Sequence, residues 1–191
     1  MLDQIAKWDE DLFLWLNGFH VDFLDPVMLF LTKTYPWIPM YAFLLFLVFK
    51  TYGKTSWWVV LAIGLTILLA DQTASGLMKP FFARLRPCHE PMLEGMMYNY
   101  GGCWGRFGFV SSHAANSFAV ATLMTLTLGQ QYPKIKWLYL WAGIFTYTRI
   151  YLGVHYPGDV LVGAMVGVLS AMVAFYFFRW VYSLVAKKQA A

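Results

Sequence analysis

Apolar residues fill five long segments of the chain, and most charged residues lie between them. A helix needs about 20 mostly apolar residues to cross a bilayer, and these segments are of about that length. None alternates strictly between apolar and polar residues, as the strands of a membrane barrel do. The pattern predicts an all-α, polytopic membrane helical bundle with spans near 26–49, 56–79, 112–130, 137–153 and 158–181.

The first segment is interrupted by Lys33, Pro36 and Pro39. Proline lacks a backbone donor and disfavours helical geometry in the residue before it. Two interpretations are therefore open: one span, or two shorter helices at 20–34 and 36–49. The chain is expected to have five to six transmembrane helices.

The stretch 2–18 is amphipathic, with apolar residues at helical spacing opposite a group of acidic ones. Such a helix is typical of the membrane interface, where its apolar face enters the lipid and its polar face stays in water. The sequence therefore predicts an interfacial helix over residues 1–20. The apolar positions are Leu2, Ile5, Trp8, Leu12, Trp15 and Leu16, and the acidic ones are Asp3, Asp9, Glu10 and Asp11.

Composition agrees with a membrane protein. The 191 residues are 60% apolar and only 13% charged, against about 45–50% and about 25% in soluble domains. A chain this short has too much surface for its volume to bury so many apolar side chains in a water-facing fold. Low hydrophobicity, which marks disordered chains, is absent. We expect one membrane domain over residues 1–191.

The connections divide into two sides if five spans alternate. The short stretches 50–55 and 130–136 and the tail 182–191 carry lysines, and the positive-inside rule makes that side cytoplasmic. The loop 80–111 and the turn 153–158 then face outward. Yet that outer side also holds seven of the 14 basic residues, so its cations need another explanation.

Three separate segments place polar residues at this outer membrane face. Ionisable groups at membrane depth are costly and indicate function. The first segment ends with a lysine and an arginine, the second opens with two serines and a histidine, and the third combines arginine, histidine and aspartate. They are Lys79 and Arg86; Ser111, Ser112 and His113; and Arg149, His155 and Asp159.

These residue types suit phosphate chemistry. Arginine forks match phosphate oxygens in pairs, and the free N–H groups at a helix start attract an anion. Two histidines can supply a nucleophile and a proton donor. Asp159 can hold one ring nitrogen of His155 and leave the other free to attack.

The order and spacing of these residues resemble the three-part signature of the type 2 phosphatidic acid phosphatases. The matching parts are Lys79-x6-Arg86-Pro87, Ser111-Ser112-His113 and Arg149-x5-His155-x3-Asp159. That superfamily includes membrane lipid phosphatases, undecaprenyl pyrophosphate phosphatases, glucose-6-phosphatase and soluble vanadium haloperoxidases. The resemblance covers roughly residues 70–175.

The resemblance implies a role for each matching residue. His155 attacks phosphorus and becomes a phosphohistidine, Asp159 orients His155, and His113 protonates the leaving group. The phosphate oxygens are held by Lys79, Arg86, Ser111, Ser112 and Arg149. No metal and no cofactor are implied, because the cations take the place of a metal ion. In three positions the chain departs from the family pattern: Val110 stands where proline is usual, Ser112 where glycine is usual, and Thr148 where serine is usual.

Further residues near the motifs are candidates for supporting roles. Asp71, Arg106 and Thr148 are candidates for contacts behind the site, whereas Arg84, outside the motif, is expected to contact lipid headgroups. Cys88 and Cys103 lie in the outer loop and can form a disulfide if that side is oxidising; two free thiols are the alternative. Gly163 and Gly167 predict a close helix contact, for which internal packing of the bundle is favoured over a dimer interface.

Together these features predict an integral-membrane enzyme that removes a phosphate from a lipid without a metal. Undecaprenyl pyrophosphate is slightly favoured as substrate over phosphatidic acid, phosphatidylglycerophosphate and lipid A. The expected location is a bacterial inner membrane, with the site on the periplasmic face and the C-terminus in the cytoplasm. Two other functions stay open: a lipid phosphotransferase with the same intermediate, and a transporter whose cations only bind an anion. No nucleic-acid partner is expected.

Overall fold

The computed structural model describes residues 2–189, and every regular element in that range is helical. The all-α prediction is confirmed for this part of the chain. An isolated bridge pairs Leu85 with Phe107 in the outer loop. The α-helices are α1 (Leu2–Asn17), α2 (Asp25–Leu31), α3 (Ile38–Tyr52), α4 (Ser56–Asp71), α5 (Lys79–Phe82), α6 (Ser112–Leu128), α7 (Leu138–Tyr151) and α8 (Pro157–Gln189).

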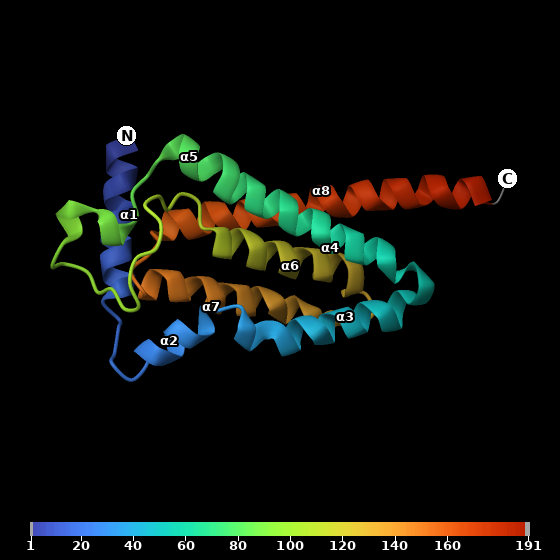
Figure 1. Cartoon of the computed structure of the whole chain (residues 1–191), viewed down its shortest axis with the longest axis horizontal. Coiled ribbons are helices and arrows are strands. Elements are labelled where there is room, and N and C mark those ends of the chain that lie inside the picture. Colours follow the sequence, from blue (N-terminus) through green and yellow to red (C-terminus); the bar gives the residue numbers. More distant parts are fainter. Residues whose placement is uncertain (1, 190–191) are drawn as a thin grey trace.

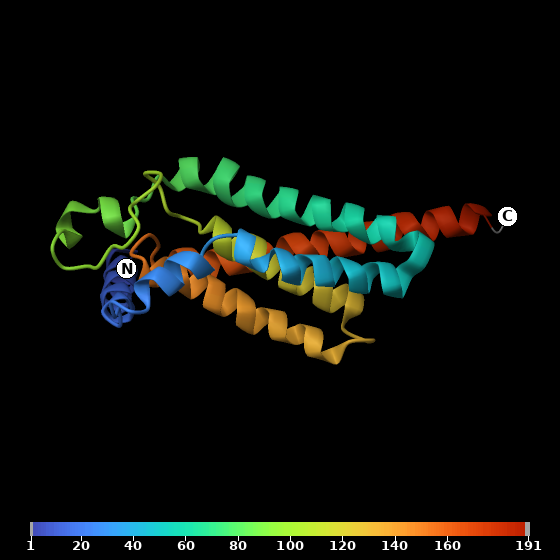
Figure 2. The same ribbon diagram turned by 60° about the horizontal axis from the view of Figure 1, so that its bottom comes forward.

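The longer helices α3, α4, α6, α7 and α8 run side by side along the long axis of the molecule (Figures 1 and 2). The α3–α4 and α6–α7 turns lie at one end of this bundle. Helix α1, the loop 83–111 and the α7–α8 turn lie at the other end (Figure 1). The arrangement separates the connections into the two groups that the sequence predicts.

The interruption in the first apolar segment is a real break. Helix α2 ends at Leu31, a short 3₁₀ turn covers Tyr35–Trp37, and α3 then begins at Ile38. Pro36 and Pro39 each occupy the first turn of the element that follows, where the missing N–H costs nothing. Of the two interpretations, two shorter helices is the correct one.

Helix α6 lies at the centre of the bundle and packs against α4, α7 and α8. Its contact with α8 is unusually close, because a Cβ at Gly167 would lie 2.1 Å from the Ala115 carbonyl oxygen. A Cβ at Gly163 would lie 2.5 Å from the Ser111 carbonyl oxygen. The predicted contact at these two glycines is therefore an internal one, and it joins the two helices that carry Ser111 and Asp159.

Helix α4 continues into a π-helical segment, η3 (Gln72–Met78), before the short α5. Wide turns of this kind often occur at functional sites because they shift the register of the following residues. Here the segment leads directly to Lys79, the first residue of the predicted motif.

Helix α1 lies across the end of the bundle (Figure 1). Phe13 is fully buried, whereas Ile5, Trp8 and Trp15 are at least half exposed. An uncovered apolar stripe on a crossing helix agrees with the interfacial position that the sequence predicts, and that position stays a prediction.

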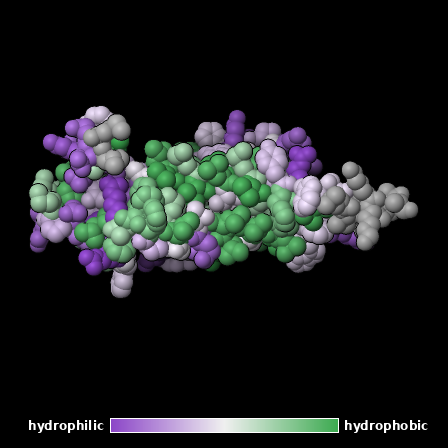
Figure 3. Space-filling model, turned by 90° about the horizontal axis from the view of Figure 1, so that it is seen from above, coloured by the Kyte–Doolittle hydropathy of each residue, from purple (hydrophilic) through white to green (hydrophobic). Residues whose placement is uncertain are grey.

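The exterior of the bundle is largely apolar, and hydrophilic residues gather at the end that carries α1 and the outer loop (Figure 3). Two helical stretches, Tyr35–Phe82 and Pro157–Ser183, are long and apolar enough to cross a membrane. The first of them includes both α3 and α4, so the number of spans stays a prediction. The side chains of the predicted tail after Ser183, Lys187 and Lys188 included, lie outside the described residues.

Candidate active site

All three predicted motifs meet at the end of the bundle that carries the outer loop. Lys79 begins α5, Arg86 lies in the loop behind it, and His113 lies in the first turn of α6. Arg149 is in the last turn of α7, and Asp159 is in the first turn of α8. Different elements therefore supply cations, histidines and an acid to one place.

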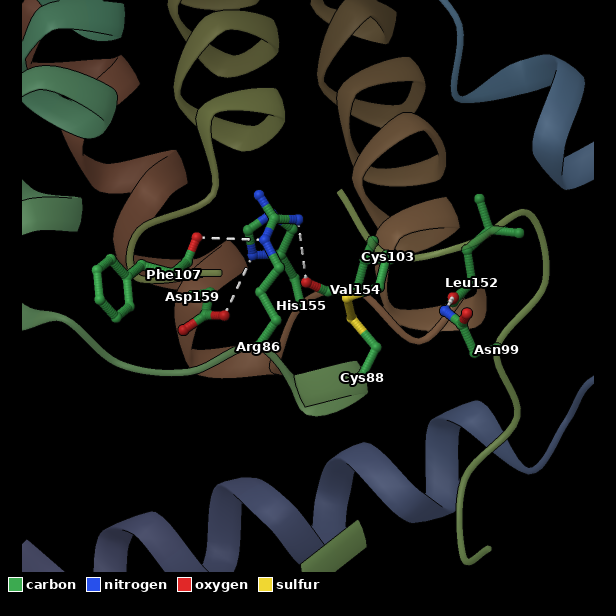
Figure 4. The surroundings of a disulfide bond; sticks show 9 residues. All are labelled: Arg86, Cys88, Asn99, Cys103, Phe107, Leu152, Val154, His155 and Asp159. Carbon is green, nitrogen blue, oxygen red and sulfur yellow. Dashed lines mark hydrogen bonds and ion pairs between the residues drawn. A yellow bond between two sulfur atoms is a disulfide. The ribbon is translucent and has the colours of Figure 1, made fainter. Parts of the chain in front are cut away.

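His155 and Asp159 form a buried pair in the α7–α8 turn. The Asp159 Oδ2 atom lies 3.2 Å from His155 Nδ1 (Figure 4). The same oxygen also accepts a hydrogen bond of 3.1 Å from the Tyr156 backbone N–H. His155 is 1% exposed and Asp159 is 0% exposed. Within the described chain, the hydrogen bonds of this imidazole involve Nδ1 alone, so Nε2 is left for a ligand.

The surroundings of His155 keep its ring neutral. Burial lowers the pKa of His155 well below the ordinary value of 6.5, and the positive charges of Arg86, Arg149 and Lys79 lower it further. A neutral imidazole has a free lone pair on one nitrogen, which a nucleophile requires.

Arg86 is held by backbone carbonyls. Its Nε donates to the Phe107 carbonyl oxygen at 3.2 Å, and its Nη1 donates to the Val154 carbonyl oxygen at 3.4 Å (Figure 4). Gly108 lies directly behind: a Cβ there would be 2.9 Å from Asp159 Oδ2 and 3.2 Å from Arg86 Cγ. The loop therefore places the arginine beside the His155–Asp159 pair, and only glycine fits at the contact.

Ser111 and Ser112 begin α6 as predicted, but their hydroxyl groups differ in their contacts. Ser111 caps the helix, accepting a hydrogen bond of 3.5 Å from the Ala114 N–H, and its own N–H donates to the Asp159 carbonyl oxygen at 3.0 Å. The Ser112 hydroxyl accepts a hydrogen bond of 2.5 Å from Lys79 Nζ and lies 2.8 Å from the Ser75 hydroxyl. The serine that replaces the family glycine therefore holds the lysine of the first motif.

His113 and Arg149 complete the cluster. The His113 ring stacks on Phe145, with ring centroids 5.3 Å apart. Arg149 Nη1 donates to the Thr32 hydroxyl at 2.8 Å, whereas its buried Nε has no partner in the described chain. Thr32 is a site residue that the sequence did not reveal, since a threonine at the end of an apolar segment carries no signal of its own.

The expectation that Arg84 contacts lipid headgroups is wrong. Its Nη1 pairs with Asp159 Oδ1 at 3.1 Å and with Asp9 Oδ2 at 2.7 Å, and its guanidinium lies 3.9 Å from the centre of the Tyr156 ring. Asp9 also accepts a hydrogen bond of 2.7 Å from the Gly158 N–H. Helix α1 is therefore tied to the start of α8 through this arginine.

The three residues expected behind the site have different surroundings. Asp71 accepts long hydrogen bonds from Ser75 and Asn116, at 3.3 and 3.5 Å, and pairs with no cation in the described chain. The Thr148 hydroxyl donates to the Phe145 carbonyl within α7, so it is occupied. Arg106 is exposed and lies over the Phe107 ring.

A cavity of about 530 Å³ extends from Ser112 and His113 into the bundle between α3, α4 and α6. Its far end is apolar, formed by Val120, Leu123 and Met124 of α6 with Leu44 and Leu45 of α3. Asp71 and Asn116 lie on its wall nearer the site. The polar cluster therefore has an apolar chamber next to it.

The outer loop is joined by a disulfide between Cys88 and Cys103, whose Cα atoms are 6.0 Å apart (Figure 4). Asn99, between the two cysteines, donates to the Leu152 carbonyl oxygen at 2.8 Å. Asn17 of α1 donates to the carbonyl oxygens of Tyr98 and Ile150. These contacts hold the loop against α1 and against the end of α7.

Comparison with known proteins identifies the family. The sequence profile of the PAP2 superfamily matches residues 55–183, which include all three motifs. The chain is 37% identical over 194 residues to a lipid A 4′-phosphatase of Bacteroides thetaiotaomicron, covering 100% of this chain and 82% of that protein. A lipid A 4′-phosphatase of Porphyromonas gingivalis is 33% identical, covering 88% of this chain and 72% of its own length.

Two further relatives widen the comparison. An undecaprenyl-diphosphatase of Sulfolobus acidocaldarius is 30% identical, covering 86% of this chain and 76% of that protein. A crystal structure of a transmembrane PAP2-type phosphatidylglycerolphosphate phosphatase from Bacillus subtilis has the same fold, with a TM-score of 0.65. It is 23% identical and covers 91% of this chain and 86% of its own. This chain therefore belongs to the PAP2 superfamily, as a hydrolase of the lipid phosphatase class.

Proposed function

We propose that the protein hydrolyses a phosphate monoester of a membrane lipid through a phosphohistidine on His155. The observation that carries the proposal is the buried pair in which Asp159 holds His155 Nδ1 and leaves Nε2 free, among three cations. A neutral, oriented imidazole beside positive charge is suited to attack an anionic phosphate.

The proposed reaction has two steps. His155 Nε2 forms a bond to phosphorus while the bond from phosphorus to the lipid oxygen breaks, and His113 gives that oxygen a proton. Water then attacks the phosphohistidine, His113 takes a proton from the water, and inorganic phosphate leaves with His155 restored. Lys79, Arg86 and Arg149 stabilise the charge on the phosphoryl oxygens in both steps, and Asp159 stabilises the positive imidazole.

The residues around His155 favour a reaction without a divalent metal. The positive charges of Arg86, Arg149 and Lys79 each lower the pKa of His155, and the same charges would repel a metal cation there. Among the described residues, no three His, Cys, Asp or Glu side chains gather as metal ligands. We expect activity to persist in EDTA, measured as phosphate release. Loss of activity in EDTA and its recovery with Mg²⁺ would contradict this part of the proposal.

A lipid A 4′-phosphate is our first candidate substrate. Two relatives with that activity in their names match 100% and 88% of the chain, at 37% and 33% identity. The slight sequence-based preference for undecaprenyl pyrophosphate is not supported by these matches. That lipid remains the second candidate, because an undecaprenyl-diphosphatase also matches 86% of the chain.

The proposed location is a bacterial cytoplasmic membrane, with the site on the periplasmic face and the C-terminus in the cytoplasm. The apolar exterior and the gathering of hydrophilic residues at the end that carries α1 and the outer loop support a membrane-spanning bundle. A disulfide in the outer loop suits an oxidising periplasm. Labelling of introduced cysteines near Lys54 and in the outer loop, in intact cells, would test the orientation.

The main experiment is phosphate release by the purified protein from lipid A, undecaprenyl pyrophosphate, phosphatidic acid and phosphatidylglycerophosphate. His155→Ala should abolish release, whereas His89→Ala, at an exposed histidine of the outer loop, should not. A transporter would keep its activity in His155→Ala. A phosphotransferase would pass labelled phosphate to a lipid acceptor rather than to water, so following the label separates the two remaining alternatives.

A further inference from the structure

A second cavity lies at the far end of the bundle from the candidate site, beside the α3–α4 turn. Its volume is about 370 Å³, and residues of α4 and α8 form most of its wall, together with Tyr52 of α3 and Thr127 of α6. On α8, Asp159 and Arg179 are separated by a helical rise of about 30 Å, which is the thickness of the hydrocarbon core of a bilayer. The cavity therefore lies at the level of one membrane surface when the candidate site lies at the other.

The lining of this cavity changes from apolar to polar toward the end of the bundle. Ala62 and Phe175 lie nearer the middle of their helices. Thr55, Arg179 and Ser183 lie nearer the end of the bundle. A phospholipid has the same order of groups, because its acyl chain points toward the middle of the membrane and its phosphate lies at the surface.

The end of the bundle that holds this cavity carries cations but no acidic residue. All ten acidic residues of the chain lie toward the other end, within 3–25, at position 71, within 90–94 and at position 159. Arg179 is exposed, forms no ion pair with the described residues, and has its guanidinium 5.6 Å from the centre of the Phe175 ring. The other cations at this end are Lys50, Lys54, Lys134 and Lys136. Anions from outside the described chain must therefore balance these charges.

We propose that this cavity binds an anionic phospholipid of the membrane leaflet opposite the candidate site. The phosphate pairs with the guanidinium of Arg179, and an acyl chain lies against Phe175 and Phe178. Basic pockets between membrane helices bind acidic headgroups in this way. The bound lipid is not the substrate, because it lies about one bilayer thickness from His155. The proposal rests on the proposed membrane-spanning bundle but not on the proposed reaction.

The test measures thermal unfolding of the purified protein in neutral detergent with added phosphatidylglycerol or phosphatidylcholine of the same acyl chains. A ligand that binds only the folded state raises the melting temperature, so phosphatidylglycerol should raise it by about 4 °C more than phosphatidylcholine does. Arg179→Gln should remove most of this difference, whereas Arg179→Lys should keep part of it. An equal effect of the two lipids on the wild-type protein, or a difference that Arg179→Gln leaves unchanged, would overturn the proposal.

Three controls separate this cavity from other sources of the same effect. Lys136→Gln removes an exposed cation at the same end of the bundle but outside the cavity, and it should keep the full difference between the lipids. Lys79→Gln removes a cation of the candidate site and should keep it too; its loss there would place the lipid at that site and contradict the proposal. Inorganic phosphate, which has no acyl chain, should not stabilise the protein, and stabilisation equal to that by phosphatidylglycerol would show a site for a free anion instead.

The outcome is independent of the proposed reaction. If none of the lipid phosphates releases phosphate but phosphatidylglycerol still stabilises the protein through Arg179, the proposed function fails and the lipid site stands. If phosphate is released but Arg179→Gln responds to phosphatidylglycerol as the wild-type protein does, only the lipid site fails.

Discussion

Arg84 donates a hydrogen bond to one oxygen of Asp159 while the other oxygen of Asp159 holds His155. The two distances, 3.1 and 3.2 Å, place the arginine and the histidine on opposite sides of one buried carboxylate. Since a buried carboxylate without a positive partner is costly, Arg84 keeps Asp159 charged and fixed in orientation. We infer that Arg84 is a positioning residue for the His155–Asp159 pair.

Loss of Arg84 should therefore affect the chemical step. In Arg84→Ala we expect kcat to fall about tenfold or more with little change in KM, because Asp159 loses its partner while the phosphate contacts remain. Arg84→Lys should recover part of the activity. The measurement is steady-state phosphate release, together with the pH profile of kcat. Arg106→Ala, at an exposed arginine of the same loop, is the control and should match the wild-type protein. An increase in KM alone would contradict the positioning role.

We expect the Ser112 hydroxyl to affect activity because it accepts a hydrogen bond from Lys79 and so positions that lysine. In Ser112→Ala the lysine loses the acceptor at 2.5 Å, and we expect kcat/KM to fall roughly three- to tenfold, as the loss of one hydrogen bond predicts. Ser112→Gly, which restores the residue usual in the family, should show the same loss. Ser170→Ala, at a buried serine of α8, serves as the control. An unchanged kcat/KM in Ser112→Ala would show that the hydroxyl does not position Lys79.

Two glycine substitutions, one at the contact between α6 and α8 and one away from it, should have opposite effects on stability. Gly167→Ala puts a Cβ 2.1 Å from the Ala115 carbonyl oxygen, so the helices must move apart, at a cost of about 1–3 kcal/mol. Gly64→Ala, in the interior of α4 with nothing within 4 Å, should instead be neutral or stabilising by about 0.5–1 kcal/mol. Thermal unfolding in detergent distinguishes them. Equal melting temperatures for the two variants would refute the close contact.

The lowered pKa of His155 predicts a dependence of stability on pH. Below about pH 6.5 the unfolded chain binds a proton at this histidine while the folded protein does not, so the unfolded state gains protons and folding stability declines as the pH falls. Above pH 6.5 the histidine is neutral in both the folded and the unfolded state, so its titration no longer changes the folding stability.

Melting temperatures of the wild-type protein and of His155→Gln, measured from pH 5 to pH 8, check this expectation. The wild-type protein should lose more stability below pH 6.5 than the variant does. His89→Gln, at an exposed position, should follow the wild-type curve. Activity should persist below pH 6.5 as well, because the nucleophile stays neutral there.

The helices and the motif residues could be predicted from the sequence because their signals are local. Long charge-free runs, two prolines and fixed spacings within each motif do not depend on the rest of the fold. The pairing of Arg84 with Asp9 and Asp159 could not be predicted, since 75 residues separate the arginine from either acid. The contact between Thr32 and Arg149 could not be predicted either, because it depends on how α2 packs beside α7.

The segment before residue 55 lies outside the family profile but contributes contacts to the candidate site. The family profile begins at residue 55 and contains every motif, yet two side chains that hold the arginines come from outside it. Asp9 of α1 binds Arg84, and Thr32 at the end of α2 binds Arg149. A fragment cut at the family boundary would keep every recognisable residue and lose these two supports. We therefore expect the smallest active fragment to be longer than the family signature and to include both α1 and α2.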